Sequence, residues 1–372
     1  MDKFLGIVFQ AGELIAQRAH TLQQVLEVVA LYNHPYNLLL ITLSLQHNQH
    51  NYKCSCDDDK KQAKQAFKIA KAKELNSQNV SCNSHLLLRK LALSYLFCFL
   101  PPFRIKQGHN AAIMGATLSS LVFQPPSLSY VSPRGINYVW IRTKNNFQLP
   151  AFYIDAHSSV TILFSHGNAE DLAMIYDWFQ HFSWKLKVNV LAYEYRGYGN
   201  AGGHATESNC YEDIQTAYYY LVQQLQVPSS NIVLYGRSLG TGPTLYLAQQ
   251  LQERQVRLGG VILQSAFLSV LRVAFPLRFT LQCDLFPNID RVGSLRVPTL
   301  FIHGTRDEVV PFSGGQELFL LTPAHCRAKP LWVHQAGHNN LEAFYEDEEA
   351  FFNPLRDFLL LSLPGYASFL LS

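Results

Sequence analysis

A serine lies at the centre of a Gly-x-Ser-x-Gly pentapeptide at residues 236–240. The apolar run before it, residues 232–235, predicts a buried strand, and residues 244–250 after it are compatible with a helix. A serine in the sharp turn between a strand and a helix is held in a strained conformation that lifts its hydroxyl out of the sheet. Ser238 is therefore the candidate nucleophile.

An attacking serine needs a histidine to take its proton and an acid to orient that histidine. In a mostly parallel sheet, such groups lie on loops just beyond the carboxyl ends of the strands. Asp307 follows one predicted strand and is the candidate acid, with Glu308 as its rival by one position. His338 follows the next predicted strand on a glycine-containing loop, whereas His303 and His334 fall within or at the ends of strands and are poorer bases. Serine, acid and histidine in this order, each after its own strand, are hard to obtain by chance.

The oxyanion that forms during attack needs two backbone donors. One is the N–H of Leu239, which follows the serine at the start of a helix. The loop at residues 165–169 follows an early predicted strand, and we expect the N–H of Asn168 in it to be the second donor. We expect His166 to brace this loop, and residues 193–199 to pack behind it.

Short apolar runs alternate with helical stretches across residues 119–372, which predicts a mostly parallel sheet with helices on both faces. Lys144, Asn145 and Asn146 form a hairpin signal between the first two strands, which should be antiparallel edge strands. The predicted strands are 138–142, 149–154, 160–164, 189–193, 232–235, 261–263, 299–302 and 331–333. The predicted helices are 175–186, 207–226, 244–250 and 340–360.

The length of 372 residues allows one large domain with an extension, and the 48% hydrophobic content is ample for a packed core. The seven cysteines are an odd number. None of them forms a C-x-x-C pair or has zinc-ligand spacing, which favours a reducing, intracellular compartment and gives no reason to expect a metal.

Residues 1–118 differ from the predicted catalytic domain at 119–372. Residues 1–114 contain 13 Lys and Arg against 7 Asp and Glu, a net charge of +6, whereas the rest of the chain has 17 against 20, or −3. Lysines on one helical face between residues 60 and 73 are either simply solvated or attracted to an anionic membrane surface. The apolar run at 91–100 is too short to span a bilayer, and is either buried or interfacial. Cys98 within it is a candidate for S-acylation.

Several segments taken together resemble the alpha/beta-hydrolase domain-containing protein 17 family, membrane-associated serine hydrolases that remove palmitate from cysteines of proteins. The resemblance covers about residues 120–361 and assigns the triad to Ser238, Asp307 and His338. Glu194 stands where an Asp is usual, and the long basic extension replaces the family's short cysteine cluster. The segments that carry the resemblance are 166–169, 193–199, 234–244, 271–276, 284–289, 303–309 and 330–333.

The resemblance implies an alpha/beta-hydrolase fold and thioester hydrolysis through an acyl-enzyme, without a metal or organic cofactor. It implies S-palmitoylated proteins as substrates and a place at the cytoplasmic face of the plasma or endosomal membrane. The basic charge, the apolar run and Cys98 lead us to expect that the N-terminal extension makes the peripheral membrane contact. We expect no nucleic-acid partner. A small-molecule esterase or lipase with the same triad is an alternative hypothesis. A catalytically inactive binding protein is another.

The segment at residues 266–296 is too short for a full lid domain. Its apolar side chains are expected to form an open groove for an acyl chain, although half of them could equally be ordinary core residues. Phe267, Leu271 and Phe275 are the candidate substrate contacts. The wider set is Phe267, Leu268, Val270, Leu271, Phe275, Phe279 and Leu281.

Overall fold

The computed structural model describes residues 122–127, 129, 138–275 and 277–370. The predicted extension at 1–118, its boundary with the catalytic domain and Cys98 lie outside the described residues. Among those described, no helix has both the length and the apolar character needed to cross a bilayer.

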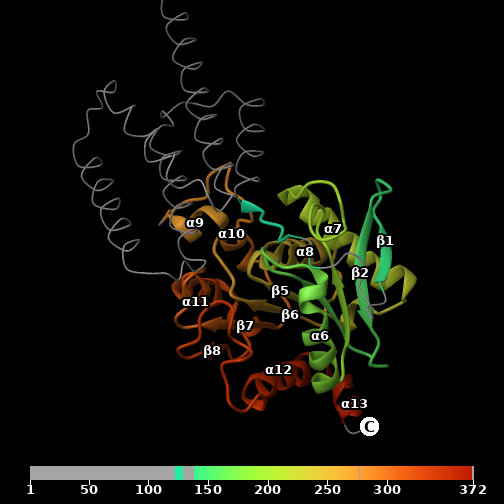
Figure 1. Cartoon of the computed structure of the whole chain (residues 1–372). Coiled ribbons are helices and arrows are strands. Elements are labelled where there is room, and N and C mark those ends of the chain that lie inside the picture. The colour runs from blue at the N-terminus through green and yellow to red at the C-terminus, as the bar shows by residue number, and fades with distance from the viewer. Residues whose placement is uncertain (1–121, 128, 130–137, 276, 371–372) are drawn as a thin grey trace, which may run out of the picture. The chain divides into compact units, whose positions relative to one another are not determined.

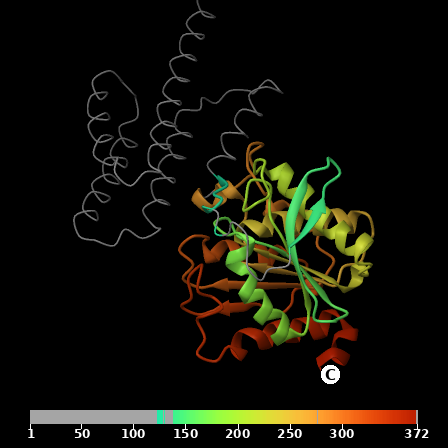
Figure 2. The ribbon, with the colours of Figure 1, turned by 45° about the vertical axis from the view of Figure 1, so that its right-hand side comes forward.

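The described part is organised around an eight-stranded sheet with the strand order β1-β2-β4-β3-β5-β6-β7-β8 (Figure 1). The β1–β2 hairpin forms one edge, and β2 also pairs antiparallel with β4 (Figure 2). All remaining pairs are parallel. The strands are β1 Tyr138–Arg142, β2 Gln148–Ile154, β3 Thr161–Ser165, β4 Asn189–Tyr193, β5 Ile232–Arg237, β6 Gly260–Gln264, β7 Thr299–Gly304 and β8 Leu331–Val333.

Helices cover both faces of the sheet, as expected when parallel strands are joined by helical crossovers. On one face, α6 and α12 contribute aromatic and aliphatic side chains to a core shared with strands β2 to β8. On the other face, α7, α8 and α11 pack on the sheet, and α10 packs between α8 and α11. The helices are α6 Leu172–Leu186, α7 Glu207–Tyr219, α8 Thr241–Glu253, α9 Val270–Ala274, α10 Asn288–Val292, α11 Phe312–Leu321, α12 Glu349–Ser362 and α13 Ala367–Leu370.

The predicted fold class is confirmed, and three helix starts differ from the prediction. Helix α8 begins at Thr241, three residues before the predicted start. Helix α6 begins at Leu172 because the side chain of Asp171 caps it, accepting a hydrogen bond from the Met174 N–H at 3.1 Å. The prediction that the last helix starts at residue 340 is wrong, since α12 begins at Glu349. Residues 338–348 form turns instead, and the Glu342 carboxylate there accepts a hydrogen bond from Gln264 at the end of β6.

The predicted helix at 207–226 is only partly α-helical and ends two residues earlier than predicted. It is regular as α7 to Tyr219 and then continues as a π-helical turn, Tyr220–Gln224.

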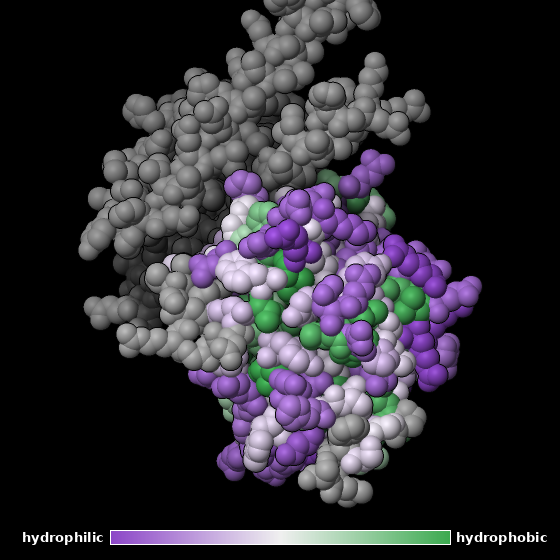
Figure 3. All heavy atoms as spheres, turned by 90° about the vertical axis from the view of Figure 1, so that its right-hand side faces the viewer, coloured by the Kyte–Doolittle hydropathy of each residue, from purple (hydrophilic) through white to green (hydrophobic). Residues whose placement is uncertain are grey.

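On the edge of the sheet, Trp140 of β1 is 53% exposed. The molecular face that contains this edge is largely hydrophilic, with apolar side chains scattered between polar ones rather than gathered in one patch (Figure 3).

Candidate active site

Ser238 lies in a sharp turn between β5 and α8. It has a φ of 51°, in the left-handed region that side-chain-bearing residues rarely adopt, and a 3-10 turn at Ser238–Gly240 leads directly into α8. A Cβ at Gly236 would collide with the Gly240 carbonyl, and one at Gly240 would collide with the Ser165 carbonyl. The two glycines therefore allow strand, turn and neighbouring loop to approach closely, and the serine stays half-buried.

A line of hydrogen bonds connects Ser238 to a buried carboxylate. His338 Nε2 lies 3.1 Å from Ser238 Oγ, and His338 Nδ1 lies 2.7 Å from Asp307 Oδ2. The side chain of His338 is 9% exposed and that of Asp307 is fully buried. A carboxylate on Nδ1 fixes the proton there, which leaves Nε2 free to accept the serine proton. The structure thus brings together Ser238, His338 and Asp307, which the sequence places on the loops after three different strands.

The carboxylate of Asp307 has donors on both oxygens. Oδ1 accepts the backbone N–H groups of Val309 at 2.9 Å and Val310 at 2.7 Å. Burial by itself would raise the pKa of Asp307, but the hydrogen bonds from His303, His338 and Val310 outweigh it and hold this pKa well below its usual range. Asp307 therefore stays ionised at neutral pH.

His303 is a contact that the sequence did not reveal. Its Nε2 lies 3.3 Å from Asp307 Oδ2 and 3.1 Å from the Val310 carbonyl oxygen. Since both neighbours are acceptors, Nε2 must carry a proton. The available signal was the position of His303 near the end of β7, four residues before Asp307.

Glu308, the rival candidate for the acid, contacts the backbone of His338 and not its imidazole. Its Oε2 accepts a hydrogen bond from the backbone N–H of His338 at 3.2 Å. The side chain of Asp307, and not that of Glu308, contacts the imidazole nitrogen. Glu308 therefore supports the loop that carries His338.

The candidate oxyanion loop, residues 165–170, begins at the last residue of β3 and packs against the turn at Gly240. In the described part of the chain, the backbone N–H groups of Asn168 and Leu239 donate no hydrogen bond, as required of oxyanion donors. Both ends of the Asn168 side-chain amide are hydrogen-bonded, because its Oδ1 accepts from Tyr198 and Gln124 and its Nδ2 donates to a backbone carbonyl. Residues 193–199 thus contact this loop directly.

His166 belongs to the candidate oxyanion loop, and its side chain is fully buried. Among the described residues, its hydrogen-bond and ion-pair partners do not include Ser238. Its Nδ1 lies 2.8 Å from the Gly167 carbonyl oxygen, and its Nε2 lies 3.3 Å from Glu194 Oε2. Burial alone would lower the pKa of His166, but the carboxylates of Glu194 and Glu170 and the Gly167 carbonyl raise it overall. The raised pKa favours a charged imidazole that braces the loop between acceptors on both sides.

The candidate substrate contacts lie on or beside α9. Phe267 is 4% exposed and Leu271 is 1% exposed, so both pack in the interior. Phe275 is half-buried, and Phe279 is 64% exposed. Phe267 and Leu271 are therefore interior residues rather than surface contacts, whereas Phe275 and Phe279 are accessible to solvent.

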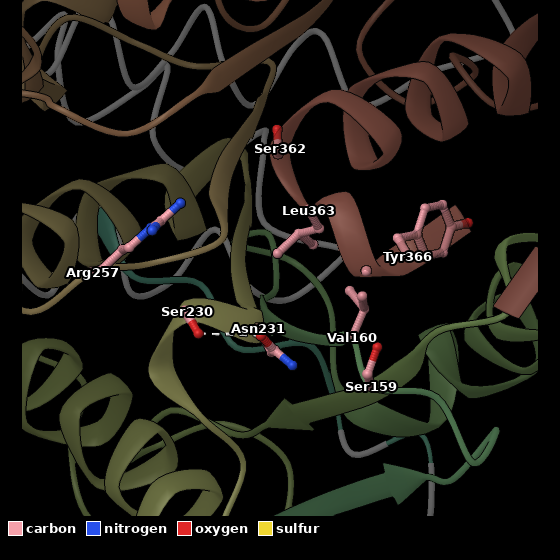
Figure 4. Close-up of a pocket in the computed structure, with 9 residues that line it drawn as sticks. Ser159, Val160, Ser230, Asn231, Arg257, Ser362, Leu363 and Tyr366 are labelled. Atoms are coloured by element: carbon pink, nitrogen blue, oxygen red, sulfur yellow. Dashed lines mark hydrogen bonds between the residues drawn. The ribbon is translucent and has the colours of Figure 1, made fainter. Parts of the chain in front are cut away.

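A cavity of about 190 Å³ occurs at the end of the sheet opposite to Ser238 (Figure 4). Ser159 and Val160 in its wall precede β3, and Ser230 and Asn231 precede β5. It lies at the amino ends of these strands, whereas Ser238 follows the carboxyl end of β5. The cavity is therefore separate from the candidate active site.

The parallel sheet, the turn at Ser238 and the hydrogen-bonded histidine and aspartate define a hydrolase of the serine alpha/beta-hydrolase superfamily. A family model described as serine aminopeptidase, S33, matches residues 156–289. The chain belongs to the alpha/beta hydrolase domain-containing protein 17 family, as its similarity to curated members shows.

Three relatives illustrate the extent of the match. Alpha/beta hydrolase domain-containing protein 17C of Xenopus tropicalis is 39% identical over 56% of this chain and 64% of its own length. Human protein 17B is 37% identical over 55% of this chain and 69% of its own length. Alpha/beta hydrolase domain-containing protein aho-3 of Caenorhabditis elegans is 35% identical over 72% of this chain and 81% of its own length. The match thus spans a little under two thirds of the Xenopus protein.

Solved structures share the fold. An esterase of Pyrococcus furiosus superposes with a TM-score of 0.53 at 20% identity, covering 65% of this chain and 98% of the esterase. An alpha-beta hydrolase of Vibrio vulnificus gives a TM-score of 0.50 at 17% identity, covering 68% of this chain and 97% of the other.

Proposed function

We propose that this protein is a serine hydrolase that cleaves acyl thioesters and removes palmitate from S-acylated cysteines of proteins. The observation that carries the proposal is the hydrogen-bond line from Ser238 through His338 to the buried carboxylate of Asp307. Membership of the protein 17 family supports the choice of a protein thioester as substrate, because resemblance to that family implies removal of palmitate from proteins. The segments that carry the resemblance include the serine turn at 234–244 and the aspartate loop at 303–309.

In the first step, Ser238 Oγ attacks the thioester carbonyl carbon while His338 Nε2 takes the hydroxyl proton. The negative charge that forms on the carbonyl oxygen is held by the N–H groups of Asn168 and Leu239, each worth about 3 kcal/mol. Asp307 keeps the proton of His338 on Nδ1 and stabilises the imidazolium. The tetrahedral intermediate then collapses, and the C–S bond breaks.

In the second step, the cysteine sulfur leaves and takes the proton from His338. A cysteine thiol has a pKa of about 8.5, so its thiolate leaves more easily than an alkoxide or amide. Water then attacks the acyl-Ser238 ester with His338 again accepting a proton. The bond from Ser238 Oγ to the acyl carbon breaks as His338 returns this proton to Oγ, and the fatty acid is released. Water is the second substrate, and the steps balance without a redox partner.

For the acyl chain, we propose a path along the segment that follows β6. Phe275 and the 64% exposed Phe279 offer apolar surface that a fatty chain would cover. Burial of that surface stabilises the complex by about 25 cal/mol per Å². The interior residues Phe267 and Leu271 would support this path from below.

The test compares turnover of an S-palmitoyl peptide with that of p-nitrophenyl butyrate and a short-chain glyceride. We expect the peptide to have the highest kcat/KM and Ser238→Ala to hydrolyse none of the three. Faster turnover of the two esters than of the peptide would instead favour a small-molecule esterase or lipase. Failure of a fluorophosphonate probe to label the protein would favour a binding protein.

A further inference from the structure

Arg237, the residue directly before Ser238, contacts carboxylates from two other segments. Its Nη2 forms an ion pair with Glu170 Oε1, and its Nη1 lies 3.8 Å from Glu342 Oε1. The side chains of Arg237, Glu170 and Glu342 are 21%, 11% and 15% exposed. Solvent therefore screens these charges less than it would screen a surface pair.

The contact with Glu170 reaches the oxyanion loop. The second carboxylate oxygen of Glu170 accepts the backbone N–H of Gly167 at 3.1 Å. The next N–H along the chain, that of Asn168, is the candidate oxyanion donor and donates no hydrogen bond among the described residues. Arg237 thus fixes, through Glu170, the backbone immediately before this donor.

The contact with Glu342 reaches the histidine loop, residues 334–348, which carries His338. The same carboxylate oxygen of Glu342 accepts a hydrogen bond from Gln264 Nε2 at 2.6 Å. The Tyr235 hydroxyl donates to the amide oxygen of Gln264. The side chains of Tyr235 and Gln264 are 2% and 1% exposed, so this end of the network is anchored inside the sheet.

We propose that Arg237 is a positioning residue that holds the oxyanion loop and the histidine loop in place around Ser238. The inference rests on the proposed role of Ser238 and adds a residue outside the triad. A guanidinium suits this task because it presents donors in a rigid plane to two carboxylates at once, whereas a lysine ammonium is a single point of charge. Arg237 acts through Glu170 and Glu342, and not by touching substrate.

The first test measures hydrolysis of p-nitrophenyl butyrate by the full chain. Arg237→Met keeps the apolar stem and removes the charge, so we expect kcat to fall about 10- to 100-fold while KM stays within about 2-fold. Arg237→Lys should recover part of this loss, and Glu170→Gln should lower kcat in the same direction. Arg254→Met is the matched control, and it should match the unaltered protein. Arg254 follows the last residue of α8, is exposed and donates a hydrogen bond to the Tyr219 hydroxyl at the end of α7.

The second test uses hydrogen exchange, which needs no turnover. In Arg237→Met, backbone amides of residues 165–171 and 338–345 should exchange faster, while those of β5 and α8 stay protected. The inference is overturned if kcat changes less than about 2-fold, if only KM rises, or if exchange in both loops is unchanged. Because an ester probe and exchange are used, inactivity toward an S-palmitoyl peptide would refute the proposed substrate without touching this inference.

Discussion

At the scale of the residue, the position of Ser238 depends on its backbone more than on side-chain packing. Its φ of 51° is maintained because β5 precedes it, α8 follows it, and both flanking glycines lie against other backbone. Such strain persists only where surrounding structure fixes it, and it commonly marks a functional position. Replacement of the hydroxyl alone should therefore leave the turn intact.

We expect Ser238→Ala to abolish hydrolysis and to leave the fold unchanged. The substitution removes one oxygen from a half-buried side chain, and the contacts of Gly236 and Gly240 remain. Turnover and labelling by a fluorophosphonate probe measure the first effect, and circular dichroism with thermal unfolding measures the second. Labelling that persisted in this variant would remove Ser238 as the nucleophile.

The two neighbouring acids should respond very differently to loss of charge. In Asp307→Asn, the amide can donate to His338 Nδ1 and stabilise the wrong tautomer, so kcat should fall about 10,000-fold. Glu308→Gln keeps an oxygen that can accept the His338 backbone N–H, and should change kcat little. Steady-state kinetics of both variants on one ester substrate give the comparison. The reverse order of effects would assign the orienting role to Glu308.

At the scale of the element, the sequence indicated the sheet well because its strands are short apolar runs bounded by turns. The strands at β1, β4 and β8 have the predicted bounds, and the others differ by a few residues at their ends. The predicted start of α12 was wrong because residues 338–348 form turns, in which Glu342 contacts the distant side chain of Gln264. Helical periodicity contains no information on such contacts.

The same reason limits what could be inferred of the site. Loop positions after strands suggested Ser238, Asp307 and His338, and the structure places them in hydrogen-bonding contact, while their catalytic roles stay a prediction. The contacts of His303 with Asp307 and of Arg237 with Glu170 depend on the pairing of strands β5, β6 and β7 and on the path of the loops. They emerge only once the sheet is assembled.

The buried pair of His166 and Glu194 should make stability depend on pH. The folded state raises the pKa of His166 above its unfolded value of about 6.5. The pair therefore stabilises the fold fully below about pH 6.5, and this contribution is lost as pH rises through the folded pKa. Glu194→Gln should lower the free energy of unfolding at pH 6 and reduce its decline toward pH 9.

Denaturant unfolding of both proteins across this pH range provides the measurement. Glu348→Gln is a matched control, because Glu348 pairs with His181 at 2.8 Å on the surface, where the two side chains are 48% and 38% exposed. It should leave the pH dependence close to that of the unaltered protein. A Glu194→Gln variant with an unchanged pH slope would show that His166 is not a charged brace.

At the scale of the whole molecule, charge is distributed unevenly along the chain. Residues 1–114 carry +6 and the rest carries −3, so electrostatic attraction to anionic lipid would have to come from the N-terminal part. A substrate with a palmitoyl chain on a membrane protein would be reached most readily by an enzyme held at that surface. We therefore place the membrane contact in the N-terminal extension as a proposal.

We expect the full chain to fractionate with membranes through two weak signals that act together. One acyl chain, at Cys98, gives only marginal binding, whereas a chain combined with a basic patch can hold a protein at the surface. Cys98→Ser combined with Lys60, Lys61 and Lys64→Gln should release the protein to the soluble fraction, and each change alone should release only part of it. If a truncated chain beginning at Ser119 stays as membrane-bound as the full chain, the contact must lie within the hydrolase domain, since that domain would then need neither the lysines nor Cys98.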